Sequence, residues 1–402
     1  MNIKYHNSKQ TKKILFLSEI HDGGEWIATN RLAGAILKSK DVMFSNSLIA
    51  FANIKFVNNF FIQASLIKHP TEKRPFSFIK NSIKDFLKLK NELQKSKDKF
   101  DIVLVSYYFA MLPLLLARKT KRNNIYYLFH GTRSVPFFSK LGFNYRNLIV
   151  LLIEFISLIL TKKIIVPSKE AKNFLLLRFK HVLKNKKIYI LPNYVPDFFY
   201  KRSIKSSEVL SFIDNKISKK LSVITYSGRF VFRKGIENLV QALNDLNSWQ
   251  NKVILTIAYP SSNMDLDLYN LLLKKIKKLK IENSVFFLPN LKQTELAYLY
   301  QKSQLIVLPS GIEMAPLLLI EGLACGTPVL ATATGNSESI LRKIDKSLIL
   351  KNNSSDEINL KIKKFLNSSV KEKQQILSAV KKISRDYTKE KTLKNFLRII
   401  NI

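Results

Sequence analysis

The sequence contains a single cysteine, Cys325, among its 402 residues. One thiol cannot form an intramolecular disulfide, so a disulfide-stapled secreted fold is excluded and a reducing compartment is expected. Cys325 lies between apolar residues, a setting that indicates a small core residue and not a nucleophile.

Acidic residues are scarce. Asp and Glu number 29 against 67 Lys and Arg, which gives a formal net charge of +38. Such a surface attracts nucleic acid, anionic lipid headgroups or phosphorylated substrates. The excess extends over both halves of the chain, and no zinc-finger or basic-leucine-zipper spacing accompanies it. Charge alone therefore does not predict a nucleic-acid reader, and biased base composition of the genome would produce the same excess.

Long apolar runs are also missing. The most apolar window, Leu148 to Leu160, is interrupted by Glu154 and is shorter than the roughly 20 residues that span a membrane. It predicts a helix that is buried or lies against a membrane surface. Residues 1–13 are mostly polar and the next apolar run, Ile14 to Leu17, is too short for a signal core, so no secretory leader is expected.

The chain is too long for one ordinary core, which predicts two domains. Short apolar runs alternate with helical patterns, as in the α/β class with parallel sheets. We place the domains at residues 1–198 and 199–385, with a final helix in 386–402. The polar, lysine-rich stretch 196–219 is interpreted as the connection between them.

The stretch from Ser303 to Ile340 organises the second half. It predicts a strand at 305–308, a turn, a helix that begins at Glu313 and ends at Gly326, and a further strand at 328–331. In such a helix Glu321 would lie about two turns from Glu313 on the same face. Glu321 could simply face solvent, but its neighbours are apolar and a buried carboxylate needs a partner.

A second constellation precedes it. A predicted strand at 222–226 leads into Gly228-Arg229, and Lys234-Gly235 opens a predicted helix at 236–246. Two cations beside the positive end of a helix can meet a pyrophosphate together.

The first half offers weaker signals. The Gly23-Gly24 turn follows a predicted strand at 12–18 and would let backbone approach a ligand, although a plain turn is the alternative. His130 follows the predicted strand 125–129, at the strand end where α/β domains bind ligands. A structural histidine is the alternative there.

Two further patterns have competing interpretations. Asp265-Leu266-Asp267 resembles a metal-binding Asp-x-Asp, but it opens a predicted helix, where Asp serves as a cap or meets the helix dipole. Residues 78–93 form a basic amphipathic pattern. Such a helix docks on an anionic membrane surface or packs on its own domain, and the sequence leaves both open.

The motifs together resemble one family. Glu313, seven residues, Glu321 and then Gly326-Thr327-Pro328-Val329, with the Gly-Arg, four residues, Lys-Gly pattern at 228–235, resemble the donor-binding segment of GT-B retaining glycosyltransferases of family 4, the glycosyl transferases group 1 superfamily. The resemblance implies a GT-B fold of two Rossmann-like domains with parallel sheets facing an interdomain cleft. It also implies that the last helix, at 393–400, crosses back to the first domain.

The resemblance also implies roles. Arg229 and Lys234 would bind the pyrophosphate without a divalent metal or other cofactor, Glu321 the ribose hydroxyls, and Glu313 the transferred sugar. The predicted catalytic residues are His130 and Glu313. The predicted donor-binding residues are Gly23, Gly24, Arg229, Lys234, Glu313, Ala315, Pro316, Leu317 and Glu321. One departure is Met314-Ala315-Pro316, where the family often has Gly-Phe-Gly and where Pro316 offers no N–H.

The implied activity is retaining transfer of a sugar from a UDP- or GDP-sugar to a glycan or lipid-linked acceptor, in cell-surface polysaccharide or lipopolysaccharide biosynthesis. The expected location is cytoplasmic, with peripheral binding at the inner face of the plasma membrane as a hypothesis. The alternatives are a catalytically degenerate GT-B scaffold or sugar-binding protein, and a nucleotide-sugar epimerase. Specific nucleic-acid binding is not expected.

Overall fold

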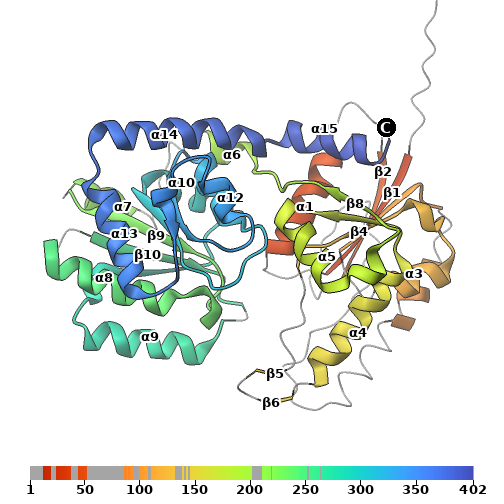
Figure 1. Cartoon of the computed structure of the whole chain (residues 1–402), viewed down its shortest axis with the longest axis horizontal. Helices are drawn as coiled ribbons and strands as arrows, with labels where there is room; N and C mark the ends of the chain where they lie inside the picture. Colours follow the sequence, from red (N-terminus) through yellow and green to blue (C-terminus); the bar gives the residue numbers. More distant parts are fainter. Residues whose placement is uncertain are drawn as a thin grey trace, which may run out of the picture. The chain divides into compact units, whose positions relative to one another are not determined.

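The computed structural model describes residues 12–19, 24–37, 44–51, 86–87, 89–91, 93–94, 99–106, 110–131, 138–139, 142–143, 145–201, 211–218, 220–250, 253–262 and 264–401. The chain divides into two compact units (Figure 1). Unit 1 comprises Met1–Leu191 with Ile399–Ile402, and unit 2 comprises Pro192–Arg398. The return of the last helix to the first domain stays a prediction.

Unit 1 is built on a six-stranded parallel sheet. Its strands, in spatial order, are β2 (Phe44–Phe51), β1 (Lys12–Glu19), β3 (Ile102–Val105), β4 (Ile125–Leu128), β7 (Lys163–Val166) and β8 (Lys187–Ile190). Its helices include α1 (Gly24–Leu37), α3 (Met111–Ala117), α4 (Tyr145–Leu160) and α5 (Lys169–Leu183). The short strands β5 (Phe138–Ser139) and β6 (Gly142–Phe143) pair antiparallel. The central strands are apolar runs because both faces of the sheet are buried.

Unit 2 repeats this plan. Its parallel strands, in spatial order, are β11 (Val285–Pro289), β10 (Val253–Tyr259), β9 (Ser222–Ser227), β12 (Leu305–Leu308), β13 (Val329–Thr332) and β14 (Ile349–Leu350). Its helices are α6 (Asp197–Tyr200), α7 (Ser211–Ser218), α8 (Ile236–Gln250), α9 (Leu266–Lys278), α10 (Gln293–Lys302), α11 (Leu317–Ala324), α12 (Ser337–Leu341), α13 (Ser355–Asn367), α14 (Val370–Ser384) and α15 (Lys389–Ile399). Short 3₁₀ helices are η2 (Arg122–Asn124) in unit 1 and η4 (Phe232–Lys234), η5 (Glu282–Ser284), η6 (Lys346–Leu348) and η7 (Arg385–Tyr387) in unit 2.

The two faces of the unit 2 sheet bury different side chains. Val223 and Ile224, consecutive residues of β9, belong to different apolar clusters because successive side chains of a strand point to opposite faces. The Ile224 face carries the larger cluster and meets α8, and the Val223 face packs against α7 and α10. Stretch 196–219, interpreted from its polar composition as the connection between the domains, contains helix α7, whose Ile213 is fully buried.

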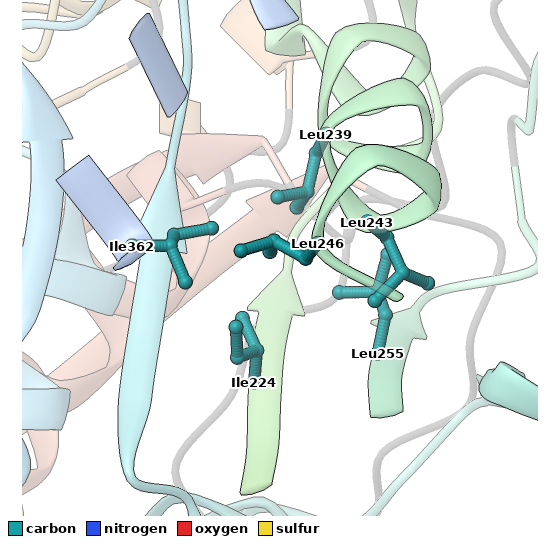
Figure 2. A pocket seen from close by; sticks show the side chains of 6 residues that line it. All are labelled: Ile224, Leu239, Leu243, Leu246, Leu255 and Ile362. Carbon is teal, nitrogen blue, oxygen red and sulfur yellow. The ribbon is translucent and has the colours of Figure 1, made fainter. Parts of the chain in front are cut away.

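One narrow apolar gap lies inside the larger cluster. It is too narrow to admit a water molecule, and α8, α13, β9 and β10 supply its lining (Figure 2): Ile224, Leu239, Leu243, Leu246, Leu255 and Ile362. A dry gap of this kind is a packing imperfection and offers no polar partner to a ligand.

None of the helices in the described part of the chain combines the length and the apolarity needed to cross a membrane. The predicted helix over the apolar window is α4, which extends from Tyr145 to Leu160.

Candidate functional site

The strand order of unit 2 defines where its loops meet. From β9 the chain adds β10 and β11 on one side, and then places β12 on the other side of β9. The carboxyl ends of β9 and β12 therefore flank a topological switch point, the place where open α/β sheets bind ligands. The two sequence constellations follow these two strands, so the fold brings them together.

The loop after β9 is shaped by Gly235. This residue ends the short helix η4 with φ +69°, and a Cβ here would lie 2.3 Å from the carbonyl oxygen of Pro309. Only glycine permits this approach of the loop after β9 to the loop after β12.

Lys234 and Glu313 form an ion pair across the switch point. Their side chains are only 14% and 11% exposed. Burial lowers the pKa of Lys234, and the Glu313 carboxylate opposes that effect. Burial, and next the Glu313 charge, raise the pKa of the fully buried Tyr226 hydroxyl. The site thus concentrates charge in a partly dehydrated setting, where electrostatic interactions are strong.

Further contacts between the two loops involve a residue that the sequence did not single out. Arg233 donates from Nη1 to the carbonyl oxygen of Ile312 at 3.1 Å, and its own carbonyl oxygen accepts from the backbone N–H of Gly311 at 2.8 Å. Arg233 therefore holds the loop that carries Glu313. Its place beside Lys234 was the only signal in the sequence, and it did not distinguish a loop clamp from a surface cation.

Glu313 is not on a helix, contrary to the prediction. Helix α11 begins at Leu317, and Pro316 before it is extended with ψ 125°. A residue before proline is disfavoured in helical conformation, so the 313–315 segment stays a loop and the carboxylate of Glu313 turns to Lys234. Ala315 is half-buried and Pro316 is buried.

Glu321 lies in the middle of α11 and is 5% exposed. Its surroundings also affect Cys325, one turn further on. Burial, and next the charge of Glu321, raise the pKa of the Cys325 thiol well above its ordinary value. A thiol that resists ionisation is a poor nucleophile, which agrees with the predicted core role of Cys325.

The loop after β13 also contacts the loop that carries Glu313. Gly335 has φ +55°, and a Cβ here would lie 2.4 Å from the Met314 carbonyl oxygen and 2.7 Å from that of Glu313. The backbone N–H of Asn336 donates to the same Met314 oxygen at 3.0 Å. Gly335 and Asn336 therefore hold the backbone of the loop that carries Glu313.

Three buried side-chain atoms on or directly after these loops have no hydrogen-bond partner among the described residues. They are Ser310 Oγ after β12, and Asn336 Oδ1 and Ser337 Oγ after β13. Buried polar atoms usually find partners, and each exception costs free energy. A polar ligand at this edge of the sheet could supply partners for them.

Arg229 is placed at the same edge but differently from Lys234. Its side chain is exposed, and its carbonyl oxygen accepts from the Tyr226 hydroxyl at 3.1 Å. That contact holds the start of the loop after β9.

Unit 1 holds the remaining predicted residues. His130 follows β4 and is half-buried, and its Nε2 lies 3.2 Å from Thr29 Oγ1 on α1. Gly24 is the first residue of α1, and Gly23 lies outside the described residues. In unit 1 the switch point lies between β1 and β3, because β2 is on one side of β1 and β3 is on the other. Ser106 after β3 donates to Ser18 of β1 at 2.7 Å, so polar groups lie at this switch point too.

The Asp265-Leu266-Asp267 pattern is a helix cap. Asp265 precedes α9 and accepts from the backbone N–H of Leu268 at 3.0 Å. The capping interpretation is confirmed. The described residues contain no cluster of three or more His, Cys, Asp or Glu side chains that could hold a metal ion.

Comparison with solved structures defines the class of fold. Sucrose-phosphate synthase from Thermosynechococcus elongatus superposes with a TM-score of 0.77 at 16% identity, covering 97% of this chain and 98% of that one. Anabaena HepE, solved in complex with UDP-glucose, gives 0.71 at 17% identity, covering 97% and 98%. The chain has the GT-B fold, and the predicted fold class is confirmed.

Sequence comparison places a family match on unit 2. Residues 210–382 match the family described as Glycosyl transferases group 1. D-inositol 3-phosphate glycosyltransferase 1 of Catenulispora acidiphila is 33% identical over 125 residues, which is 30% of this chain and 30% of that protein. The aligned stretch thus spans under a third of that relative. The family match contains Arg229, Lys234, Glu313 and Glu321, and it does not extend to His130.

Proposed function

We propose that the protein is a retaining glycosyltransferase of family 4 that moves a sugar from a UDP- or GDP-sugar to a glycan or lipid-linked acceptor. The observation that carries the proposal is the largely buried ion pair of Lys234 and Glu313 at the switch point between β9 and β12. The group 1 match over residues 210–382 supports it. Cell-surface polysaccharide or lipopolysaccharide synthesis is the proposed pathway, and the cytoplasm the proposed location.

The chemistry of the transfer fits these residue types. When the sugar leaves, negative charge grows on the pyrophosphate and positive charge grows on the sugar ring. In the proposal Arg229 and Lys234 stabilise the pyrophosphate without a divalent metal. An arriving pyrophosphate competes with Glu313 for the Lys234 ammonium, which frees the Glu313 carboxylate to face the sugar.

The remaining roles follow the family resemblance. Glu321, buried in α11, is proposed to bind the ribose hydroxyls, and the loop residues Ala315, Pro316 and Leu317 to line the sugar position together with Gly23 and Gly24. His130 is proposed to act at the reacting carbon. The orphaned hydroxyls of Ser310 and Ser337 would gain partners from the bound donor.

An assay of nucleoside diphosphate release tests the proposal. The protein is incubated with radiolabelled nucleotide sugars and a membrane fraction that carries acceptors. We expect release with one donor, together with label in the acceptor fraction. Glu313→Gln and His130→Ala should each lower the rate by about a hundredfold or more, because each removes a group that acts in the transition state.

A matched control is Glu282→Gln, an exposed carboxylate at the opposite edge of the sheet, in η5 before β11. Its rate should equal that of the wild type. Release without incorporation, with an epimerised sugar, would identify an epimerase. No release from any donor would support a degenerate scaffold.

A further inference from the structure

Helix α4 in unit 1 is amphipathic, but it buries polar side chains and exposes large apolar ones. Its polar residues Glu154 and Ser157, and Thr161 directly after its last turn, are at most 2% exposed. Its outward stripe consists of four large apolar side chains spaced i, i+3, i+4 and i+7, with exposed fractions of 50%, 39%, 43% and 44%: Leu152, Phe155, Ile156 and Ile159. A surface helix normally shows the opposite arrangement.

The inner face fixes this orientation. Thr161 Oγ1 donates to the Ser157 carbonyl oxygen at 2.8 Å and contacts Met111 Sδ of α3 at 3.7 Å. Phe155, at the edge of the stripe, packs its ring against Phe179 of α5 at a centroid distance of 6.4 Å. Rotation of α4 to bury the stripe would break these contacts, so the apolar side chains stay outside. A contiguous exposed apolar stripe marks an interaction surface.

Cations surround the carboxyl end of the same helix. Arg122 Nη2 and Lys186 Nζ donate to the Ile159 carbonyl oxygen at 2.9 and 3.0 Å. The next strands begin with Lys163 and Lys187, which are register partners. The exposed cations of this region are Arg118, Lys121, Arg122, Lys162, Lys184 and Lys187. Between residues 145 and 191 the acidic residues are Glu154, which faces inward, and Glu170.

We propose that α4 docks unit 1 on an anionic membrane surface, with the stripe of Leu152, Phe155, Ile156 and Ile159 at the acyl boundary and the cations on lipid phosphates. The side chains of the stripe carry no hydrogen-bonding group. They therefore suit lipid tails, which form no hydrogen bonds. A second copy of this face would bring few carboxylates to these cations, because Glu170 is the one acidic residue of 145–191 that is not buried. A nucleic acid offers no apolar phase to receive leucine and phenylalanine.

The other expected membrane contact, the pattern at 78–93, is less suited to this role. Most of it lies outside the described residues, but helical Leu89 and Leu93 are buried, at 2% and 0% exposed. These two apolar positions are already used in packing. The proposed membrane-binding surface thus lies on a helix for which the sequence left burial and membrane contact open.

Vesicle co-sedimentation with the full chain tests the proposal. The probes are phosphatidylcholine vesicles with and without phosphatidylglycerol, at low and raised salt. The wild type should bind the anionic vesicles and lose binding as salt rises. Leu152→Gln with Ile156→Gln should weaken binding at least about tenfold, since two inserted side chains are removed. Lys162→Gln with Lys184→Gln should weaken it at low salt only.

The matched control is Leu360→Gln with Leu377→Gln on α13 and α14, which are 61% and 43% exposed in unit 2. It should bind as the wild type does, and unchanged thermal unfolding verifies that each variant folds. The proposal is overturned if wild-type protein ignores anionic vesicles or if the stripe variant binds equally. Self-association that the stripe variant abolishes, without vesicle binding, would also overturn it. These readouts do not depend on sugar transfer, so the two proposals fail separately.

Discussion

Lys234 is the residue whose protonation decides the strength of the proposed donor site. Burial lowers its pKa from the ordinary 10.5, so the ammonium loses its proton at a lower pH than an exposed lysine does. Pyrophosphate binding needs the ammonium. Affinity for nucleoside diphosphate should therefore fall as pH rises through that lowered pKa.

Titration calorimetry across the alkaline range, in wild type and Lys234→Arg, measures this. Arginine keeps its charge over the whole range, so the affinity of Lys234→Arg should stay flat where that of the wild type declines. Parallel pH profiles for the two proteins would show that Lys234 does not carry the dependence.

Gly335 is predicted to hold the Glu313 loop in place. In Gly335→Ala the new Cβ meets two carbonyl oxygens and sits at φ +55°. We expect a loss of about 1–3 kcal/mol in the free energy of unfolding and weaker donor binding, because the loop must move. Urea unfolding and calorimetry measure the two effects.

Gly326→Ala is the matched control. Gly326 has φ +79° but open space around its Cβ position, so alanine should cost about 1 kcal/mol of conformational strain and leave donor binding unchanged. If both variants bind donor as the wild type does, Gly335 does not position the site.

Sequence reasoning at this scale found the charged residues but not their geometry. Arg229, Lys234, Glu313 and Glu321 were identified from motif spacing, since pyrophosphate chemistry needs those residue types. The sequence did not indicate that Glu313 pairs with Lys234, because that contact depends on two loops 79 residues apart. Arg233 was missed for the same reason.

At the scale of elements, strands were predicted most accurately. β12 has the predicted bounds, 305–308, because a short apolar run between turn residues specifies a buried strand. Helix α5 begins after Ser168, a residue type that favours the N-cap position, and the Ser168 side chain accepts from the Ala171 N–H at 3.0 Å. The start of α11 was wrong because the effect of Pro316 on the residue before it outweighed the apolar pattern.

The narrow gap beneath α8 makes this helix a sensitive probe of packing. Leu243 lines the gap and is 2% exposed. Leu243→Ala should lower the free energy of unfolding by about 3 kcal/mol, since the truncation enlarges a cavity that cannot collapse. Leu360→Ala, 61% exposed on α13, should change it by less than about 0.5 kcal/mol. Equal losses in urea unfolding would contradict the packing described for α8.

At the scale of the whole molecule, chain length predicted two domains, and the repeated strand and helix pattern predicted the α/β class. The chain divides into two compact units, each built on a parallel sheet. Strand order could not be read from the sequence. It places the loops after β9 and β12 side by side and so assembles the candidate site. The net charge predicted attraction to anions, but it did not indicate where on the molecule anions bind, because a count of charged residues contains no positions. The apolar stripe of α4 became visible only when burial assigned its polar residues to the inside.

The central claim, a nucleoside diphosphate site built by Lys234, Glu313 and Glu321, is tested most directly by thermal unfolding. UDP, GDP, ADP, CMP and their sugars are added to the wild type and to Glu321→Ala, each compared with its own ligand-free midpoint. The nucleotides of one base should raise the thermal unfolding midpoint of the wild type by several degrees at saturating concentration. Glu321→Ala should not show that shift. No shift with any nucleotide, or an equal shift in both proteins, would contradict the site.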